Sequence, residues 1–180
     1  DTSKILRAKG RMGIYYLEAG ANQRPSKVVY DRDKASIALA KPGDIDWDAT
    51  LAGAGWFHIT GITPALGPGP RGCVERALRE ASQLSFDVNY RATLWASAEA
   101  RAFAESVLPR ARYFFLGEAE ARILFNLTGS AEATLEALAR LAPKATIALL
   151  QGPEGSTVLD GGRLWRPSRQ YTVQMVDPVG

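Results

Sequence analysis

The chain has 180 residues, a formal net charge of +3 from 22 basic and 19 acidic side chains, and 46% hydrophobic residues, enough for one domain with a real core. Its single cysteine excludes an internal disulfide framework and suits a cytoplasmic protein, and its single histidine leaves little for a histidine metal cluster or a Ser-His-Asp triad. The evenly mixed charges are unlike a nucleic-acid-binding stripe, and no apolar run approaches the roughly 20 residues that cross a bilayer. We therefore expect neither a nucleic acid nor a membrane as partner.

The first strand pattern along the chain predicts a hairpin. Residues 12–17 and 27–32 are rich in strand formers, and the connection between them, residues 18–26, is rich in Gly, Asn and Pro. Both runs mix apolar and polar residues, which is more typical of a flap than of a core strand. We expect a β-hairpin over residues 12–32 that contributes to a lid.

Strands and helices then alternate. The predicted strands are 56–60, 84–91, 113–116 and 146–150, followed by a hairpin of 156–159 and 163–166 and a last strand at 172–176. The predicted helices begin near 44–47, at 72, at 97 with Ser97 as cap, at 118, and at 130 with Ser130 as cap. This alternation predicts parallel β-α-β units with helices on both faces of one sheet. Without a repeat or linker, we expect one α/β domain over residues 1–180.

Residues 84–91 carry the most informative polar pattern. Asp87, Asn89 and Arg91 occupy alternate positions, so in a strand they would project from one face near its end. Ligands of open α/β sheets bind beyond the carboxyl ends of the strands. An acid, an amide and a guanidinium there suit a polar, anionic small molecule. The competing interpretation is a strand end whose polar residues cap a neighbouring loop.

Polar or glycine-rich turns follow four of the predicted strands, at residues 60–63, 89–91, 117–120 and 151–155. In a parallel sheet these turns would share one rim, which favours a binding crevice. Glu120 lies in the first turn of a helix. It can simply complement the helix dipole, or it can order the water shell of Mg²⁺ beside phosphates, because magnesium takes few protein ligands.

Three further features leave alternatives open. His58 lies within an apolar strand and is interpreted as a packed core residue. Arg32 follows aromatic residues of the hairpin, which can form a solvated face or clamp a carboxylate bidentately. Gly180 follows an apolar strand, where a glycine turn opening a helix would cradle an anion, although only that one glycine is present.

In combination, five segments resemble the ribokinase-like carbohydrate kinases, and most closely the 2-keto-3-deoxygluconate kinases. In chain order they are Gly-Ile-Tyr-Tyr at 13–16, Val-Tyr-Asp-Arg at 29–32, Trp-Phe-His-Ile-Thr-Gly-Ile-Thr-Pro-Ala-Leu at 56–66, Phe-Asp-Val-Asn-Tyr-Arg at 86–91 and Val-Asp-Pro-Val-Gly at 176–180. The resemblance spans essentially the whole chain. It implies a three-layer α/β/α sandwich with a mostly parallel sheet and a small β lid.

The resemblance implies ATP-dependent phosphorylation of the C6 hydroxyl of 2-keto-3-deoxygluconate, giving 2-keto-3-deoxy-6-phosphogluconate, with ATP and Mg²⁺ as cofactors. The positions that match substrate-binding residues are Tyr15, Tyr30, Arg32 and Arg91. The positions that match nucleotide-binding residues are Asn89, Tyr90, Arg91, Gly117, Gly152, Gly155 and Gly180. Glu120 would reach the metal through water. The family's lid often forms a dimer contact, so a homo-oligomer through the lid is expected.

Departures from the family pattern keep alternatives open. Gly117 stands where the family usually has Asn or Ser, and the connection at residues 81–83 is short. The family's catalytic Asp belongs to Gly-Ala-Gly-Asp, of which Gly180 is the first residue, so we expect no catalytic base within the chain and no phosphoryl transfer by these residues alone. The family's early glycine-rich segment is also expected ahead of Asp1. The alternatives are a kinase for a neutral sugar such as fructose and a non-catalytic sugar-binding or regulatory module.

Overall fold

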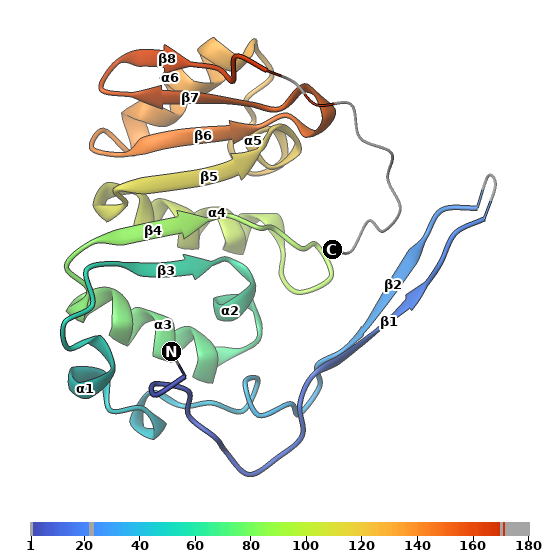
Figure 1. Ribbon diagram of the computed structural model, residues 1–180, viewed down its shortest axis with the longest axis vertical. Helices are drawn as coiled ribbons and strands as arrows, with labels where there is room; N and C mark the ends of the chain where they lie inside the picture. The colour runs from blue at the N-terminus through green and yellow to red at the C-terminus, as the bar shows by residue number, and fades with distance from the viewer. Residues whose placement is uncertain (1, 22–23, 170, 172–180) are drawn as a thin grey trace.

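The computed structural model describes residues 2–21, 24–169 and 171. Its largest element is a six-stranded sheet. The order of the strands in the sheet follows their order in the chain (Figure 1): β3 (Phe57–Thr60), β4 (Leu84–Asp87), β5 (Tyr113–Gly117), β6 (Thr146–Leu150), β7 (Ser156–Asp160) and β8 (Arg163–Trp165). Neighbours from β3 to β6 are parallel, and β7 and β8 continue as an antiparallel hairpin. The mostly parallel sheet predicted from the alternating pattern is confirmed.

The helices lie in the connections between these strands: α1 (Trp47–Leu51), α2 (Ile62–Ala65), α3 (Pro68–Glu80), α4 (Ser97–Val107), α5 (Glu118–Phe125) and α6 (Ala131–Leu141), with short 3₁₀ turns η1 (Pro42–Asp44), η2 (Leu108–Arg110) and η3 (Gly152–Glu154). In Figure 1, α4 and α6 lie behind the sheet, and α3 lies beside its edge strand β3. Crossovers between sequential parallel strands are right-handed, so they return on the same side. The sequence predicted helices on both faces of the sheet. Within the described residues, the helices of these crossovers form one layer on one face.

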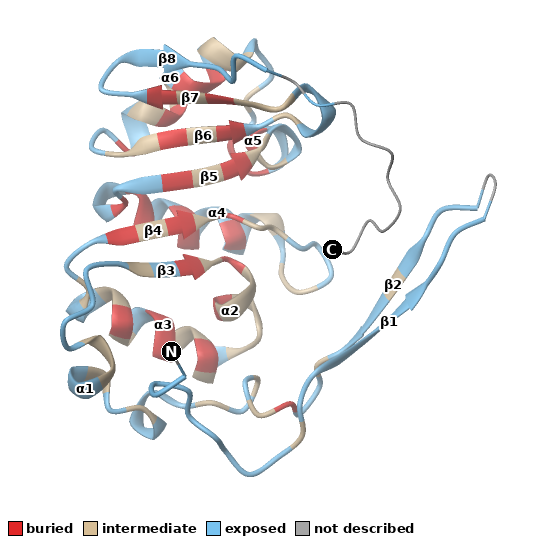
Figure 2. Cartoon of the chain, viewed as in Figure 1, coloured by how far each residue is buried: buried red, intermediate tan, exposed pale blue. Residues whose placement is uncertain are grey.

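Alternating burial along the strands places the core between the sheet and this layer (Figure 2). Phe86 of β4 stacks on Phe114 of β5 with ring centroids 6.0 Å apart, and Phe103 of α4 meets Phe86 edge-on at 6.1 Å. All three side chains are fully buried. Such a cluster is the main source of stability in a domain of this size.

The opposite face of the sheet corrects one prediction. His58 was expected in the core, but it is exposed, with Nδ1 3.0 Å from Oγ of Ser85 on the next strand. A strand alternates its side chains, and Ile59 takes the buried side. On the same open face as His58, Trp56 packs on Tyr113 at 4.9 Å between ring centroids.

Helix caps show how local signals fix the helix starts. Ser130 caps α6 as predicted, since its hydroxyl accepts the amide proton of Ala133. Asp46 likewise accepts the amide proton of Ala49 at the start of α1. The predicted cap at Ser97 is wrong: Ser97 is the first helical residue of α4, and Ala96 holds the cap position without a side-chain hydrogen bond.

The strand predicted over residues 84–91 ends early, at Asp87. The Asp87 carboxylate accepts the amide proton of Asn89 at 3.2 Å, and Asn89 adopts a left-handed conformation with φ +39°. This local turn competes with strand pairing. The alternation argument for Asp87, Asn89 and Arg91 therefore fails beyond Asp87. The predicted strand at 172–176 and Gly180 lie outside the described residues.

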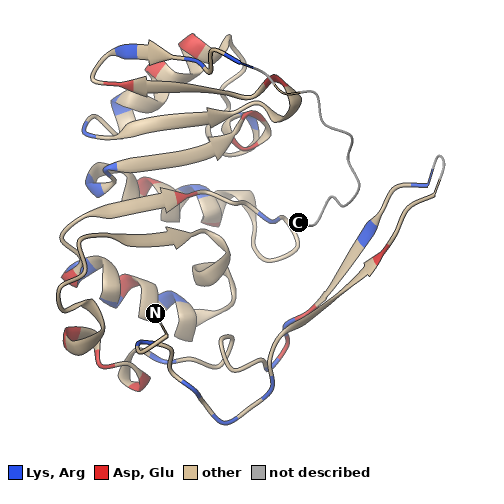
Figure 3. Ribbon diagram, viewed as in Figure 1, with Lys and Arg blue, Asp and Glu red and all other residues tan. Residues whose placement is uncertain are grey.

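A separate two-stranded sheet forms the flap, with β1 (Ile14–Glu18) antiparallel to β2 (Lys27–Asp31). Its side chains are exposed or half-buried, as predicted for a flap. In Figure 1 it projects on the side to which the carboxyl ends of the parallel strands point. Basic and acidic residues are intermixed over the flap and helices, and the strand centres of the large sheet carry few charges (Figure 3). No helix in the described part of the chain is long and apolar enough to cross a membrane.

Candidate functional site

The loops that follow β3 and β4 touch at the carboxyl edge of the sheet. The Gly61 amide donates to the Asp87 carbonyl at 2.9 Å, and the Val88 amide donates to the Phe115 carbonyl of β5 at 3.0 Å. A Cβ atom at Gly61 would lie 2.2 Å from the Val88 carbonyl oxygen, so only glycine permits this approach. Backbone hydrogen bonds thus connect the carboxyl ends of β3, β4 and β5.

Glu120 joins the β4 loop to the start of α5. One carboxylate oxygen accepts the Tyr90 amide proton at 2.5 Å, and the other accepts the Gly117 amide proton at 2.7 Å. The Gly117 bond is half of a capping box at the helix start. The half-buried Glu120 thus faces the rim, where the sequence predicted it, with both oxygens engaged by backbone amides.

A third connection reaches the turn after β6. The Gln151 side-chain amide donates to Glu118 at 2.8 Å, and its carbonyl accepts the hydroxyl proton of the fully buried Thr157 at 2.7 Å. The four turns predicted to share a rim are therefore neighbours. Sequence reasoning missed the Gln151–Thr157 pair, for which the available signal was a threonine within an apolar strand.

Charged groups near the end of β4 influence each other. Burial is the main cause that raises the pKa of the Asp87 carboxyl above its ordinary value, against the opposing pull of the Asn89 amide, His58 and Arg91. The Arg91 side chain is exposed, and its Nη1 donates to the Tyr90 carbonyl at 3.0 Å. The rim thus presents a guanidinium next to a carboxyl that resists ionisation.

Three of the residues predicted to bind the substrate, Tyr15, Tyr30 and Arg32, lie close together on the flap. The rings of Tyr15 and Tyr30 pair across the strands with centroids 6.2 Å apart, and the Arg32 guanidinium lies 4.0 Å from the Tyr30 ring centroid. Both tyrosines are exposed. In the described residues no contact joins Arg32 to Arg91, which follows β4 on the sheet.

The glycines predicted to face the nucleotide differ in what their positions require. Gly152 and Gly155 have φ of +57° and +90° and shape the turn η3, so side chains there would be strained. Gly117 has an ordinary φ of −86°, and a Cβ would meet Glu120 Oε2 at 3.6 Å and the Leu150 carbonyl oxygen at 3.9 Å, both ordinary van der Waals distances. The missing Asn side chain at Gly117 is therefore a difference in chemistry and not a steric necessity.

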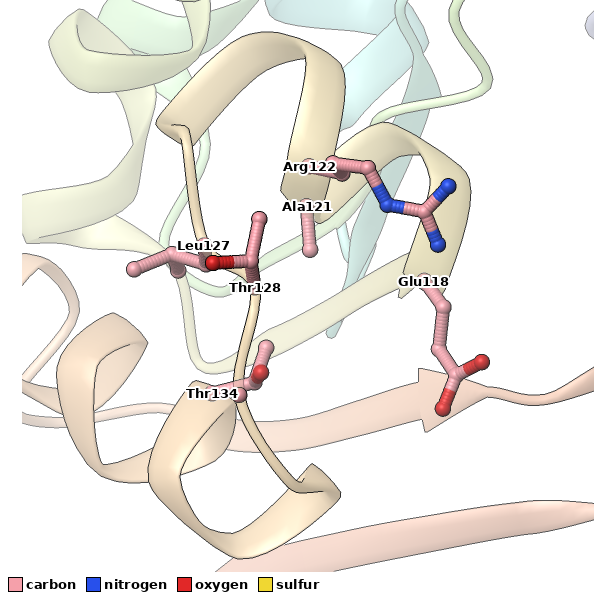
Figure 4. Close-up of a pocket in the computed structure, with 7 residues that line it drawn as sticks. Glu118, Ala121, Arg122, Leu127, Thr128 and Thr134 are labelled. Atoms are coloured by element: carbon pink, nitrogen blue, oxygen red, sulfur yellow. The ribbon is translucent and has the colours of Figure 1, made fainter.

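A cavity of about 270 Å³ lies between α5 and α6, beside this rim (Figure 4). Glu118 and Arg122 of α5 flank it, and Thr128, Gly129 and the buried Thr134 line the other side. None of the residues predicted from sequence to bind substrate or nucleotide lines it.

The donors on the rim suit a polyanion. The exposed Arg91 offers guanidinium donors to phosphates. In the turn η3, the amides of Glu154 and Gly155 already donate to the carbonyls of Gln151 and Gly152. The described residues contain no cluster of three His, Cys, Asp or Glu side chains able to enclose a metal ion. A magnesium ion held mainly by phosphates and water would need few protein ligands, and Glu120 is the residue of the rim that would bind its water.

The pfkB family carbohydrate kinases match the chain over residues 1–180. A 2-dehydro-3-deoxygalactonokinase of Haloferax volcanii is 31% identical over 174 residues, 94% of this chain and 54% of that protein. The crystal structure of a 2-dehydro-3-deoxygluconokinase from Thermotoga maritima is 33% identical with a TM-score of 0.78, covering 86% of this chain and 52% of that one. An E. coli protein assigned to ribokinase II, solved with ATP and Mg²⁺, shares the fold at 19% identity and a TM-score of 0.72, covering 86% and 50%.

The chain spans about half the length of these relatives. The predicted ribokinase-like α/β fold is confirmed by the structural neighbours, and the resemblance to carbohydrate kinases is confirmed by the family match. The chain belongs to the pfkB family of carbohydrate kinases.

Proposed function

We propose that the protein carrying this chain transfers the γ-phosphoryl group of ATP to the C6 hydroxyl of 2-keto-3-deoxygluconate, with Mg²⁺ as cofactor. Arg32 is the observation that carries the choice of a sugar acid. It is half-buried against the Tyr30 ring and has no ion pair among the described residues, so its charge is available to a substrate carboxylate. The relatives from H. volcanii and T. maritima are both named for 2-keto-3-deoxy sugar acids, which supports this substrate class.

The proposed roles follow the position of each residue. Tyr15 and Tyr30 would hydrogen-bond the sugar from the flap, and Arg91 would lie between the sugar acid and the phosphates. Nucleotide contacts are assigned to the rim residues Asn89, Tyr90, Gly117, Gly152 and Gly155. Phosphoryl transfer depends mostly on positioning and charge neutralisation, which guanidinium and amide donors supply. Bound Mg²⁺ supplies additional neutralisation of the phosphates, and Glu120 would hold its water.

Replacing Arg32 tests the substrate class. In the native gene product that carries this sequence, Arg32→Ala should lower kcat/KM for 2-keto-3-deoxygluconate about a hundredfold, because a charge-assisted pair contributes on the order of 2–3 kcal/mol. A coupled ADP assay measures it. Arg24→Ala is the matched control, since this flap arginine pairs with Glu18 and should change kcat/KM by less than about twofold.

The alternatives predict different results in the same assay. A kinase for a neutral sugar would phosphorylate fructose at least as well as the sugar acid, and Arg32→Ala would leave both rates alike. A binding module would show no ADP release while a titration calorimeter detects sugar-acid binding. For the 180 residues by themselves we expect no turnover, since the proposed catalytic Asp would follow Gly180; robust turnover by this chain would contradict that.

We also propose self-association through one face of the flap. Ile14, Tyr16 and Val29 share the face opposite Tyr15 and Tyr30, because paired residues of an antiparallel ladder point the same way. The charged residues Glu18, Lys27 and Asp31 lie at the two ends of this face. Tyr16 is 60% and Val29 46% exposed. A second copy is the proposed partner of the apolar centre of this face, at Tyr16 and Val29, which leaves the Tyr15 face for substrate.

A further inference from the structure

We propose that Glu120 is a positioning residue: it clamps the loop at residues 87–91 to the first turn of α5, and through Tyr90 it fixes where Arg91 stands. The catalytic part of this inference depends on the proposed kinase function; the clamp itself does not. Its basis is the pair of short bonds from the Tyr90 and Gly117 amides to the two oxygens of one carboxylate, 2.5 and 2.7 Å long.

The bond to Tyr90 distinguishes a clamp from an ordinary helix cap. A capping box accounts for the Gly117 bond, because helices often place a Glu at their third position. It does not account for an acceptor shared with Tyr90, which lies 30 residues away on another strand-end loop. A carboxylate accepting two amide protons forms charge-assisted hydrogen bonds, which are stronger than neutral ones. Glu120 therefore connects two loops of the rim.

The loop that Glu120 holds needs such a restraint. Asn89, which precedes Tyr90, has φ +39°, a left-handed conformation that is uncommon outside glycine and that asparagine adopts more readily than most residues. The Asp87 carboxylate secures the loop on one side, through the Asn89 amide. Glu120 secures it on the other side, one residue before Arg91.

Arg91 depends on this backbone directly. Its Nη1 donates to the carbonyl of Tyr90, the residue whose amide Glu120 binds. The same residue is thus bound by Glu120 at its amide and by Arg91 at its carbonyl. A shift of the Tyr90 backbone would move the guanidinium that the proposed mechanism places between the substrate carboxylate and the phosphates, and small displacements of such groups are costly.

Hydrogen exchange of single amides tests the clamp in the 180-residue chain. Glu120→Gln keeps the shape of the side chain but has only one acceptor oxygen, and Glu120→Asp keeps the charge but is one methylene shorter. In at least one of the two variants the Tyr90 amide should exchange about tenfold faster or more, while the Phe86 amide in β4 keeps its rate. Glu118→Gln is the matched control, because it removes a charge from the same helical turn without touching Tyr90. Unchanged exchange of the Tyr90 amide in both Glu120 variants would overturn the clamp, even if the Gly117 amide exchanged faster, because a change at Gly117 alone is what a helix cap predicts.

Kinetics of the native gene product test what the clamp does. Glu120→Gln should lower kcat about tenfold or more with KM for the sugar acid unchanged, and excess Mg²⁺ should not restore kcat. Full recovery at high Mg²⁺ would show that Glu120 acts only through the metal, and would overturn the positioning role. If the unsubstituted protein has no kinase activity, the proposed function fails, and the exchange rates still decide the clamp.

Discussion

At the scale of single residues, acidic side chains of this protein bind backbone amides at loops and helix starts. Asp87 binds the Asn89 amide, Glu120 binds the Tyr90 amide, and Asp46 caps α1. Each carboxylate replaces hydrogen bonds that the backbone lost where a strand ended or a helix began. The shape of the rim therefore depends on a few side-chain acceptors as much as on the sheet beneath it.

Asp87 makes a pH-dependent contribution to stability whose sign follows from its surroundings. Burial is the largest effect on this carboxyl and raises its pKa above the ordinary 3.8, so the folded chain holds the proton more tightly than the unfolded chain. The resulting cost is absent below pH 3.8, grows as the pH rises through the raised pKa, and is complete above it.

Asp87→Asn should remove that cost while keeping an oxygen acceptor for the Asn89 amide. We expect the free energy of unfolding of the variant, relative to the unsubstituted chain, to increase as the pH rises above 3.8 and then to level off. The change should stay below about 1 kcal/mol, since Asp87 is partly exposed. Urea unfolding over a pH series measures it, and a difference that decreases with pH would contradict the argument.

At the scale of elements, the starts of α4 and α6 show that the same residue type has different effects at neighbouring positions. Both helices have a serine near the start, but only Ser130 is the cap residue and binds an amide. Ser97 stands one position later, where its hydroxyl makes no cap bond. A serine stabilises a helix start only from the position whose backbone is still extended.

This difference can be measured with a matched pair. Ser130→Ala should lower the free energy of unfolding by about 1 kcal/mol, because the Ala133 amide loses its acceptor. Ser97→Ala should change it by less than about 0.5 kcal/mol, as alanine is favourable inside a helix. Equal losses for the two variants in urea unfolding would show that the cap assignment is wrong.

At the scale of the whole molecule, the flap and the large sheet differ in how their apolar side chains are covered. The sheet buries one face against α3, α4 and α6, whereas the flap is a two-stranded ribbon with apolar residues on both faces. A pair of strands alone is marginally stable in water. A second copy on the Tyr16 face and a substrate on the Tyr15 face would each cover one side of it.

Opposite faces of the flap provide the test of self-association. Tyr16→Asp should shift the protein from dimer to monomer, because a charge would enter the proposed apolar contact. Tyr15→Asp makes the same change on the other face and should leave the dimer intact. Light scattering after size exclusion reports the mass. An unsubstituted protein that is monomeric, or a dimer that survives Tyr16→Asp, would refute the proposed interface.

The sequence by itself determined the elements whose signals are local. The flap strands, the helix capped by Ser130, the strand at 146–150 and the turn at Gly161 and Gly162 follow from residues adjacent in the chain. The alternating pattern also gave the parallel sheet and, with it, the rim where the four turns meet. These features are predictable because period and turn chemistry act over a few residues.

Only the tertiary structure decided the rest. The side of β3 on which His58 emerges depends on where α3 and its neighbours pack. The early end of β4 is different, because it follows from a local turn of Asp87 with Asn89 that the alternating pattern did not reveal. The partner of Glu120 lies 30 residues earlier in the chain, on a loop brought next to α5 by the order of strands in the sheet. A sequence pattern specifies which groups need partners, whereas the packing of strands far apart in the chain specifies which partners they find, because such contacts carry no local periodic signal.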